Sequence, residues 1–296
     1  MRLLDALKSS TEYLEEAGIE DAFADAEILT FDAAGADRLA AYMENPEITK
    51  ELLSKIRRLI RRRAKGEPLQ YIVGHVDFLG LTIYVGKGVL IPRPETELLA
   101  EEAIRTVQSS KFKVQSPKSS SRQRSTIPAL RILDLCSGTG CIALAIAKAT
   151  PDADVCGTDV SRAALRFAKK NAEVNEIENV SFLEGSLFAP ILGSALFDLI
   201  VSNPPYIISA DIPRLQREIK DWEPLEALDG GTDGLDFYRK IFADAAGHLR
   251  PGGAVLCELG FGQAAAVKEI AQKSGFRDIS VNKDYAGIDR ILKAEL

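Results

Sequence analysis

The most constraining stretch of this 296-residue chain is Arg131-Ile132-Leu133-Asp134-Leu135-Cys136-Ser137-Gly138-Thr139-Gly140. Its first half carries the apolar residues Ile132, Leu133 and Leu135 and is predicted to be a buried strand. Its second half is a glycine turn that leads into a predicted helix from about Cys141 to Ala149. Glycines at a strand-to-helix turn let backbone N–H groups approach a ligand closely. The stretch therefore predicts an α/β sheet with a ligand site at the carboxyl ends of its strands.

An acid follows the next predicted strand. This strand runs from Ala153 to Thr158 and ends on Asp159, about 20 residues after Gly138, where a ribose-binding carboxylate belongs in such sheets. The segment 138–143 also fits the G-x-G-x-x-A fingerprint of dinucleotide-binding proteins, so a nicotinamide-dependent oxidoreductase is one interpretation. This interpretation and any other nucleoside-binding function of the turn require an adenosine-type ribose at Asp159.

A third apolar run, Phe197 to Ser202, is followed by Asn203-Pro204-Pro205-Tyr206. The prolines fix the backbone and remove N–H donors, which leaves a stiff segment rich in acceptors. A planar NH₂ group could donate to the Asn203 side-chain oxygen and to the Pro204 carbonyl, with its flat face against Tyr206. The alternative is a proline-rich turn that only ends a strand.

The rest of the second half alternates strands and helices. Strands are predicted at 180–183 and 254–258, and helices at 235–248 and 263–274, which indicates a doubly wound, mostly parallel sheet. Two final strands, 279–282 and 290–294, have no helix between them. This ending departs from a dinucleotide-binding domain, whose units keep alternating.

The first 68 residues carry helical periodicity and no catalytic constellation. The last helix of this region has a basic face that could meet an acidic protein or RNA, or simply face solvent; it comprises Arg57, Arg58, Arg61, Arg62, Arg63 and Lys65. Residues 69–90 are expected to form a linking β-hairpin, with strands at Tyr71–Val73 and Leu81–Val85. Residues 91–296 form the predicted α/β domain.

Two segments between these regions stand out. Leu90-Ile91-Pro92-Arg93-Pro94-Glu95-Thr96-Glu97 changes from strand to helix start, and stiff polar segments of this kind often line clefts. Residues 109–128 are rich in serine, lysine and arginine, and we interpret them as a flexible surface insertion.

Composition narrows the function classes. The net charge of −6 argues against a protein that binds long nucleic acid over its whole surface. No apolar run is long enough to span a membrane and no signal-peptide core is present, so a cytoplasmic location is expected. No metal site is expected, because neither histidine lies near a cysteine in the sequence. The cysteines are interpreted as buried thiols; they are Cys136, Cys141, Cys156 and Cys257.

These residues together make the chain resemble the HemK or PrmC family, the protein N(5)-glutamine methyltransferases that act on class 1 peptide chain release factors. Four blocks carry the resemblance and span nearly the whole chain: 66–74 with Phe78, 90–97, 133–143 and 201–206. Asn-Pro-Pro-Tyr also occurs in amino-methylating DNA enzymes and therefore indicates only the type of reaction. The block at 90–97 and the hairpin before it point to this family.

The resemblance implies a seven-stranded class I methyltransferase sheet, a small helical N-terminal domain that helps to engage the release factor, S-adenosylmethionine as cofactor, and a monomer. The implied cofactor-binding residues are Cys136, Ser137, Gly138, Thr139, Gly140, Asp159, Ser186, Leu187 and Asn203. Catalysis is assigned to Asn203, Pro204 and Tyr206. Substrate binding is assigned to these three with Pro205, Arg93 and Glu95. Family members often have an acid and an aromatic residue where this chain has Ser186 and Leu187, which leaves the adenine contacts open.

The expected reaction is methyl transfer to the side-chain nitrogen of the glutamine in the Gly-Gly-Gln motif of class 1 release factors. A nucleic-acid adenine N6-methyltransferase would use the same Asn-Pro-Pro-Tyr segment on a flipped base. That alternative should show a basic surface or a target-recognition domain. A non-enzymatic binding module would need no such segment.

Overall fold

The computed structural model describes residues 1–109, 130–191, 193 and 196–296. The expected insertion at 109–128 lies, apart from its first residue, outside the described residues. The chain divides into two compact units. The first comprises 1–75, 85–87 and 215–223, and the second comprises 76–84, 88–214 and 224–296. The described part of the chain contains no helix with the length and hydropathy needed to cross a lipid bilayer.

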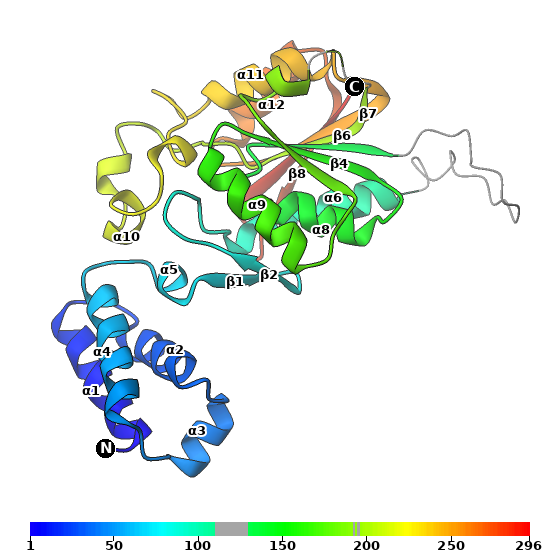
Figure 1. Cartoon of the computed structure of the whole chain (residues 1–296). Coiled ribbons are helices and arrows are strands. Elements are labelled where there is room, and N and C mark those ends of the chain that lie inside the picture. The colour runs from blue at the N-terminus through cyan, green and yellow to red at the C-terminus, as the bar shows by residue number, and fades with distance from the viewer. Residues whose placement is uncertain (110–129, 192, 194–195) are drawn as a thin grey trace, which may run out of the picture. The chain divides into compact units, whose positions relative to one another are not determined.

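The first unit is helical (Figure 1). Its core is formed by apolar side chains on the inner faces of the longer helices, among them Leu3, Leu29 and Ile56, which have no exposed surface. Side-chain caps start two of the helices, because Asp37 accepts from the backbone N–H groups of α3 and Thr49 from that of α4. The helices are α1 (Leu3–Glu16), α2 (Ala22–Ala34), α3 (Arg38–Glu44), α4 (Lys50–Ala64), α5 (Leu69–Val73) and α10 (Arg217–Lys220).

The expected first strand of the hairpin was wrong. Tyr71–Val73 lies in α5, which ends at Gly74 in the left-handed conformation. The hairpin strands are β1 (His75–Phe78) and β2 (Leu81–Tyr84). Residues 76–84 group with the second unit, where the side-chain amide of Asn171 donates to the Tyr84 carbonyl at 3.2 Å and accepts from its N–H at 2.8 Å. The segment 69–90 is therefore divided between the two units.

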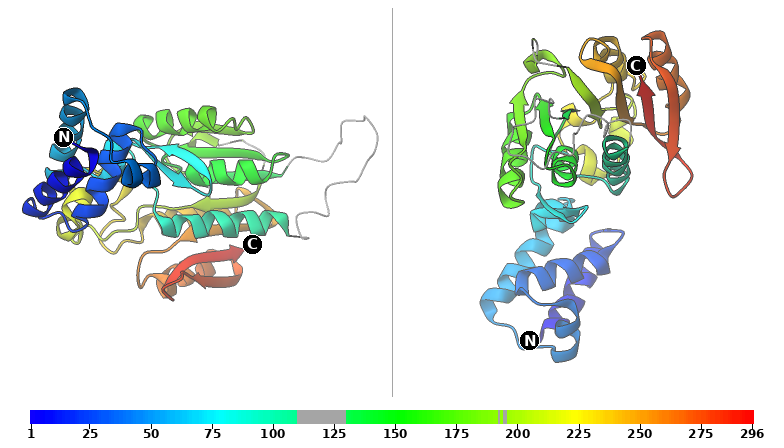
Figure 2. Two further views of the ribbon diagram at one scale, coloured as in Figure 1. Left: turned by 90° about the horizontal axis from the view of Figure 1, so that it is seen from below. Right: turned by 90° about the vertical axis from the view of Figure 1, so that its right-hand side faces the viewer.

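The second unit is a seven-stranded sheet with helices on both faces (Figure 2). The strand order is β5-β4-β3-β6-β7-β9-β8, and only the pairs that include β9 are antiparallel. Helices α6, α8 and α9 cover one face, and α11 and α12 cover the other (Figures 1 and 2). The predicted doubly wound, mostly parallel seven-stranded sheet is confirmed, including the final strand pair without a helix.

The strands of this sheet are β3 (Arg131–Leu135), β4 (Asp154–Asp159), β5 (Val180–Glu184), β6 (Phe197–Ser202), β7 (Leu249–Glu258), β8 (Arg277–Lys283) and β9 (Asp289–Glu295). The helices are α6 (Pro94–Gln108), α8 (Cys141–Ala149), α9 (Arg162–Val174), α11 (Asp236–Ala245) and α12 (Ala264–Lys273), with short 3₁₀ turns η1 (Ala189–Ile191), η2 (Ile212–Arg214) and η3 (Leu225–Ala227).

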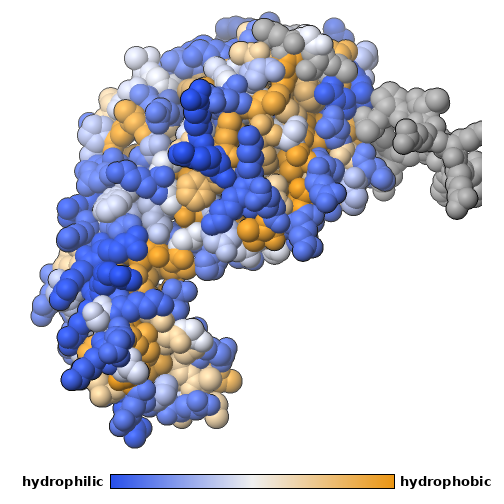
Figure 3. All heavy atoms as spheres, viewed as in Figure 1, coloured by the Kyte–Doolittle hydropathy of each residue, from blue (hydrophilic) through white to orange (hydrophobic). Residues whose placement is uncertain are grey.

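Helix α9 shows how sequence pattern selects the buried face. Its apolar side chains Ala164, Leu165 and Ala168 are buried. The opposite face carries Arg166 and Lys169, and Figure 3 shows polar residues covering this helix. The helix thus buries its apolar stripe against the sheet.

The strand register sets the position of the site. Leu135 at the end of β3 pairs with Thr158 of β4 on one side and Ser202 of β6 on the other. Ser202 in turn pairs with Cys257 of β7. The residue that follows each of these positions therefore emerges at one common edge of the sheet.

Candidate active site

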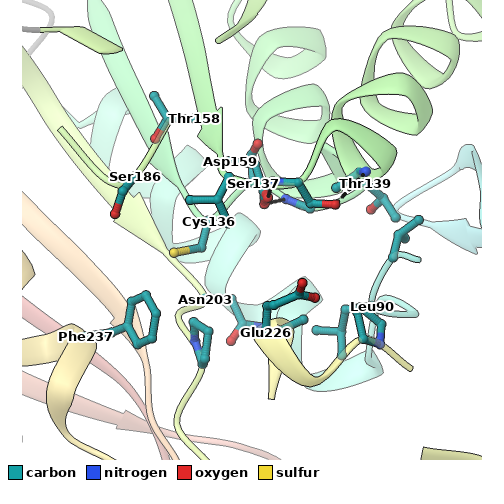
Figure 4. Close-up of a pocket in the computed structure, with 18 of the residues that line it drawn as sticks. Leu90, Cys136, Ser137, Thr139, Thr158, Asp159, Ser186, Asn203, Glu226 and Phe237 are labelled. Atoms are coloured by element: carbon teal, nitrogen blue, oxygen red, sulfur yellow. Dashed lines mark hydrogen bonds between the residues drawn. The ribbon is translucent and has the colours of Figure 1, made fainter. Parts of the chain in front are cut away.

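A pocket of about 430 Å³ opens at this edge. Its walls include the turn after β3, the end of β4 with the segment after β5, the residues after β6, and the segment 88–96; Phe237 and Lys240 of α11 also line it. The turn η3 closes another side with Leu225 and Glu226. Figure 4 shows Asp159, Cys136, Asn203 and Glu226 around one open space.

The turn after β3 is made by residues in left-handed backbone conformations, with φ of 58° at Cys136, 54° at Gly138 and 79° at Gly140. The two glycines have different surroundings. A Cβ atom at Gly140 would lie 2.8 Å from the ring of Phe182, whereas one at Gly138 would meet nothing within 4 Å. Gly140 is therefore required for packing, and Gly138 leaves open space where it lines the pocket.

These surroundings predict unequal effects of adding one methyl group. Gly138→Ala should cost about 1–2 kcal/mol of unfolding free energy, the cost of a left-handed residue with a Cβ. Gly140→Ala should cost a further ~1–3 kcal/mol, because the methyl group also overlaps Phe182. Chemical denaturation of both variants measures the difference. Equal losses of stability would contradict this assignment of roles.

Asp159 ends β4 and anchors the turn after β3. Its two carboxylate oxygens accept from the backbone N–H groups of Gly138 and Ser161, each at 2.8 Å. Burial raises the pKa of Asp159, and these two hydrogen bonds act in the opposite direction. The carboxylate lines the pocket, and each oxygen keeps a lone pair that can accept from a ligand hydroxyl.

Asn203 is held by a chain of hydrogen bonds that starts at a buried acid. The Asn203 Nδ2 group donates to Thr96 Oγ1 at 3.1 Å, and the Thr96 hydroxyl donates to Glu258 Oε2 at 2.8 Å. Thr96 lies in the first turn of α6 and Glu258 is the last residue of β7. The other carboxylate oxygen of Glu258 accepts from the Tyr206 hydroxyl at 3.3 Å.

Glu258 is 1% exposed, and burial raises its pKa to about 7. The hydrogen bonds from Thr96 and Tyr206 and the charge of Arg290 act against this shift, while the charge of Glu95 adds to it. Burial also raises the pKa of Tyr206 above its usual range. Tyr206 is therefore a neutral hydrogen-bond donor.

The structure brings most of the predicted site residues to this pocket. Those that line it are Cys136, Ser137, Gly138, Thr139, Asp159, Ser186, Leu187, Asn203 and Pro205. Gly140, Pro204, Tyr206, Arg93 and Glu95 are outside the lining, within the described part of the chain. Of these, Arg93 acts on Tyr206 and Glu95 on Glu258 through their charges.

Sequence reasoning missed Thr96, Glu258 and Glu226. Glu258 ends a predicted strand, as Asp159 does, so the same argument from strand ends could have found it. Thr96 lies inside the segment 90–97, between Glu95 and Glu97. Glu226 belongs to a short turn without a recognisable pattern. The described residues contain no group of three or more metal-ligating side chains that could hold a metal ion.

Comparison with known proteins gives consistent matches for both units. Residues 5–74 match the family model of the PrmC N-terminal domain, and residues 122–218 match that of the methyltransferase small domain. The chain is 48% identical over 256 residues to the release factor glutamine methyltransferase of Thermodesulfovibrio yellowstonii, a match that covers 86% of each chain.

A second relative and a solved structure agree with these matches. The release factor glutamine methyltransferase of Geobacter sulfurreducens is 44% identical over 281 residues, which cover 95% of this chain and 92% of that one. A methyltransferase from Pyrococcus furiosus has a similar fold, with a TM-score of 0.51 and 21% identity over 73% of this chain and 89% of that chain.

Proposed function

We propose a reaction for this chain on the ground that it belongs to the release factor glutamine methyltransferase family. It transfers a methyl group from S-adenosylmethionine to a glutamine side-chain nitrogen of class 1 peptide chain release factors. The glutamine is that of the Gly-Gly-Gln motif. One observation carries the proposal for this site. The NH₂ group of Asn203 is tied to Thr96, so its oxygen is the atom left for a substrate amide at the pocket.

The pocket suits the cofactor. Its volume lies in the range of small-molecule sites, and its lining is mostly apolar with a few polar groups. Ser137 Oγ lines the pocket, is buried and has no hydrogen-bond partner among the described residues, so a ligand could satisfy it. The Asp159 carboxylate can accept from two ribose hydroxyls. When bound, S-adenosylmethionine supplies a methyl group activated by a sulfonium ion.

Asn203 and Pro204 supply the acceptors that the reaction needs. An amide nitrogen is a poor nucleophile, because its lone pair is delocalised into the carbonyl group. Hydrogen bonds from the substrate NH₂ group to Asn203 Oδ1 and the Pro204 carbonyl would hold the nitrogen in line and strengthen as it becomes positive. Tyr206 would pack against the amide plane. The proton can leave to water afterwards, so no dedicated base is required.

Labelled methyl transfer tests the proposal. The protein is incubated with methyl-labelled S-adenosylmethionine and, separately, with a class 1 release factor, the same factor with the motif glutamine replaced by alanine, tRNA and DNA. We expect label only in the unmodified release factor. Label in tRNA or DNA and none in the release factor would favour an adenine methyltransferase.

We further propose that the helical unit recognises the release factor. Arg57 and Arg61 lie one turn apart on α4 and are both exposed. Reversing both charges to glutamate should raise KM for the release factor by about tenfold, with kcat and cofactor affinity unchanged. The same change at Arg166 and Lys169 of α9 is the control. Equal effects of the two double variants would contradict recognition by α4.

A further inference from the structure

We infer that Glu258 and Thr96 are positioning residues that orient the side-chain amide of Asn203 for the proposed reaction. This inference rests on the proposed function. Neither residue touches the substrate in this scheme. They act by allowing only one of the two orientations of the Asn203 amide.

The orientation of the Asn203 amide follows from the direction of the hydrogen bonds. When Glu258 is ionised its carboxylate only accepts, so Thr96 then gives its single hydroxyl proton to Glu258 Oε2, at 2.8 Å. Thr96 Oγ1 can then only accept from Asn203, and only the NH₂ end of that amide can donate. The Asn203 oxygen is therefore directed away from Thr96, where it can accept from a substrate amide.

Burial prevents water from replacing the hydrogen bonds that link Asn203, Thr96 and Glu258. Thr96 is 2% exposed and Glu258 is 1% exposed, so no bulk water competes for their hydrogen bonds. The backbone carbonyl of Glu258 accepts from the Tyr238 hydroxyl at 2.8 Å, and Tyr238 is fully buried. Glu258 is thus held in place twice. Its side chain is bound by α6 and the Asn-Pro-Pro-Tyr segment, and its backbone carbonyl is bound by α11.

Protonation of Glu258 would allow both orientations of the Asn203 side-chain amide. A protonated carboxyl can donate to Thr96, and the freed threonine hydroxyl can then donate to Asn203 and stabilise the reversed amide. The groups that bear on this equilibrium are Thr96 of α6, Tyr206, Arg290 of β9 and Glu95 of α6. Because burial raises the pKa of Glu258 to about 7, kcat should fall as the pH decreases through that value.

Four variants test the inference. Glu258→Gln keeps the size of the side chain but can donate to Thr96, and Thr96→Val keeps the shape but removes the hydroxyl. We expect each to lower kcat by roughly 10-fold, with KM for the release factor nearly unchanged. Thr96→Ser should restore most of the activity that Thr96→Val loses. Thr106→Val is the matched control, because Thr106 lies on the same helix, is buried, and has no hydrogen-bond partner for its hydroxyl among the described residues.

Two further readouts separate orientation from a merely structural role. The fall of kcat at low pH should be present in the unmodified protein and absent from Glu258→Gln. In the substrate-free protein, the ¹⁵N–¹H signals of the Asn203 side-chain amide should shift with a midpoint near the pKa of Glu258, and should not titrate in Glu258→Gln.

The outcomes distinguish this inference from the proposed function. If the unmodified protein does not methylate a release factor, the proposed function fails, and the amide signals alone decide on Glu258. If it does methylate one and both Glu258→Gln and Thr96→Val keep its kcat and pH profile, the inference is overturned. A parallel loss of cofactor affinity in these variants would also overturn it, because the hydrogen bonds of Thr96 and Glu258 would then support the cofactor pocket.

Discussion

Asn203→Ala is expected to lower kcat by roughly 10²- to 10³-fold, the effect of deleting one preorganised electrostatic partner. The substitution removes the oxygen that would accept from the reacting amide, and this hydrogen bond becomes stronger as positive charge grows on nitrogen. An interaction that is stronger in the transition state affects rate more than substrate binding. Steady-state kinetics on a release factor measure kcat and KM, and calorimetry should show nearly unchanged affinity for S-adenosylmethionine.

Asn203→Asp is the sharper companion to this variant. Aspartate keeps the shape and an acceptor, but it would add a negative charge beside the cationic sulfonium of the proposed cofactor and cannot donate to Thr96 as the amide does. Cofactor affinity could rise while turnover falls, because the carboxylate stabilises the charged reactant as well as the transition state. Near-normal turnover of Asn203→Ala would show that the Asn-Pro-Pro-Tyr segment only ends a strand.

Asp159→Ala is expected to weaken cofactor binding by about 1.5–3 kcal/mol, the range for hydrogen bonds to a charged group. This corresponds to roughly 10- to 150-fold in the dissociation constant. The structure adds a second cause, since the same carboxylate accepts from the N–H groups of Gly138 and Ser161 and so organises the turn that lines the pocket. Calorimetry with S-adenosylmethionine measures the loss.

Two companion variants separate these causes. Asp159→Asn keeps one acceptor oxygen and should lose less affinity than Asp159→Ala. Asp154→Ala changes an acid at the other end of the same strand, where it pairs with Arg131 on the surface, and should leave cofactor affinity unchanged. If Asp159→Ala folds normally and binds the cofactor as tightly as the unmodified protein, the ribose assignment is wrong.

The centre of the sheet could be predicted because β3 and β6 are buried on both faces. Their apolar residues cluster as Ile132-Leu133 with Leu135 and as Leu199-Ile200-Val201, and each strand is followed by a polar or glycine-containing turn. The hairpin was harder, because Tyr71–Val73 is too short and apolar for periodicity to separate a helix from a strand. There, Pro68 at the start and Gly74 at the end mark a helix of five residues.

Local sequence was sufficient for the loops that follow individual strands. Asp159 and Asn203 each stand at the carboxyl end of a predicted strand, and the carboxyl ends of parallel strands are where ligands bind. The roles proposed for these two residues stay predictions that rest on elementary chemistry, because a carboxylate accepts from hydroxyls and an amide oxygen accepts from N–H groups.

Tertiary structure alone revealed what holds Asn203. Thr96, Asn203 and Glu258 are separated by 107 and 55 residues, and the hydrogen bonds between them depend on the register of β6 with β7 and on where α6 begins. Neither a strand pattern nor a motif encodes which distant side chain meets another. The physical reason is that sequence patterns report local conformation and burial, whereas a hydrogen bond forms only when packing brings two particular atoms within about 3 Å.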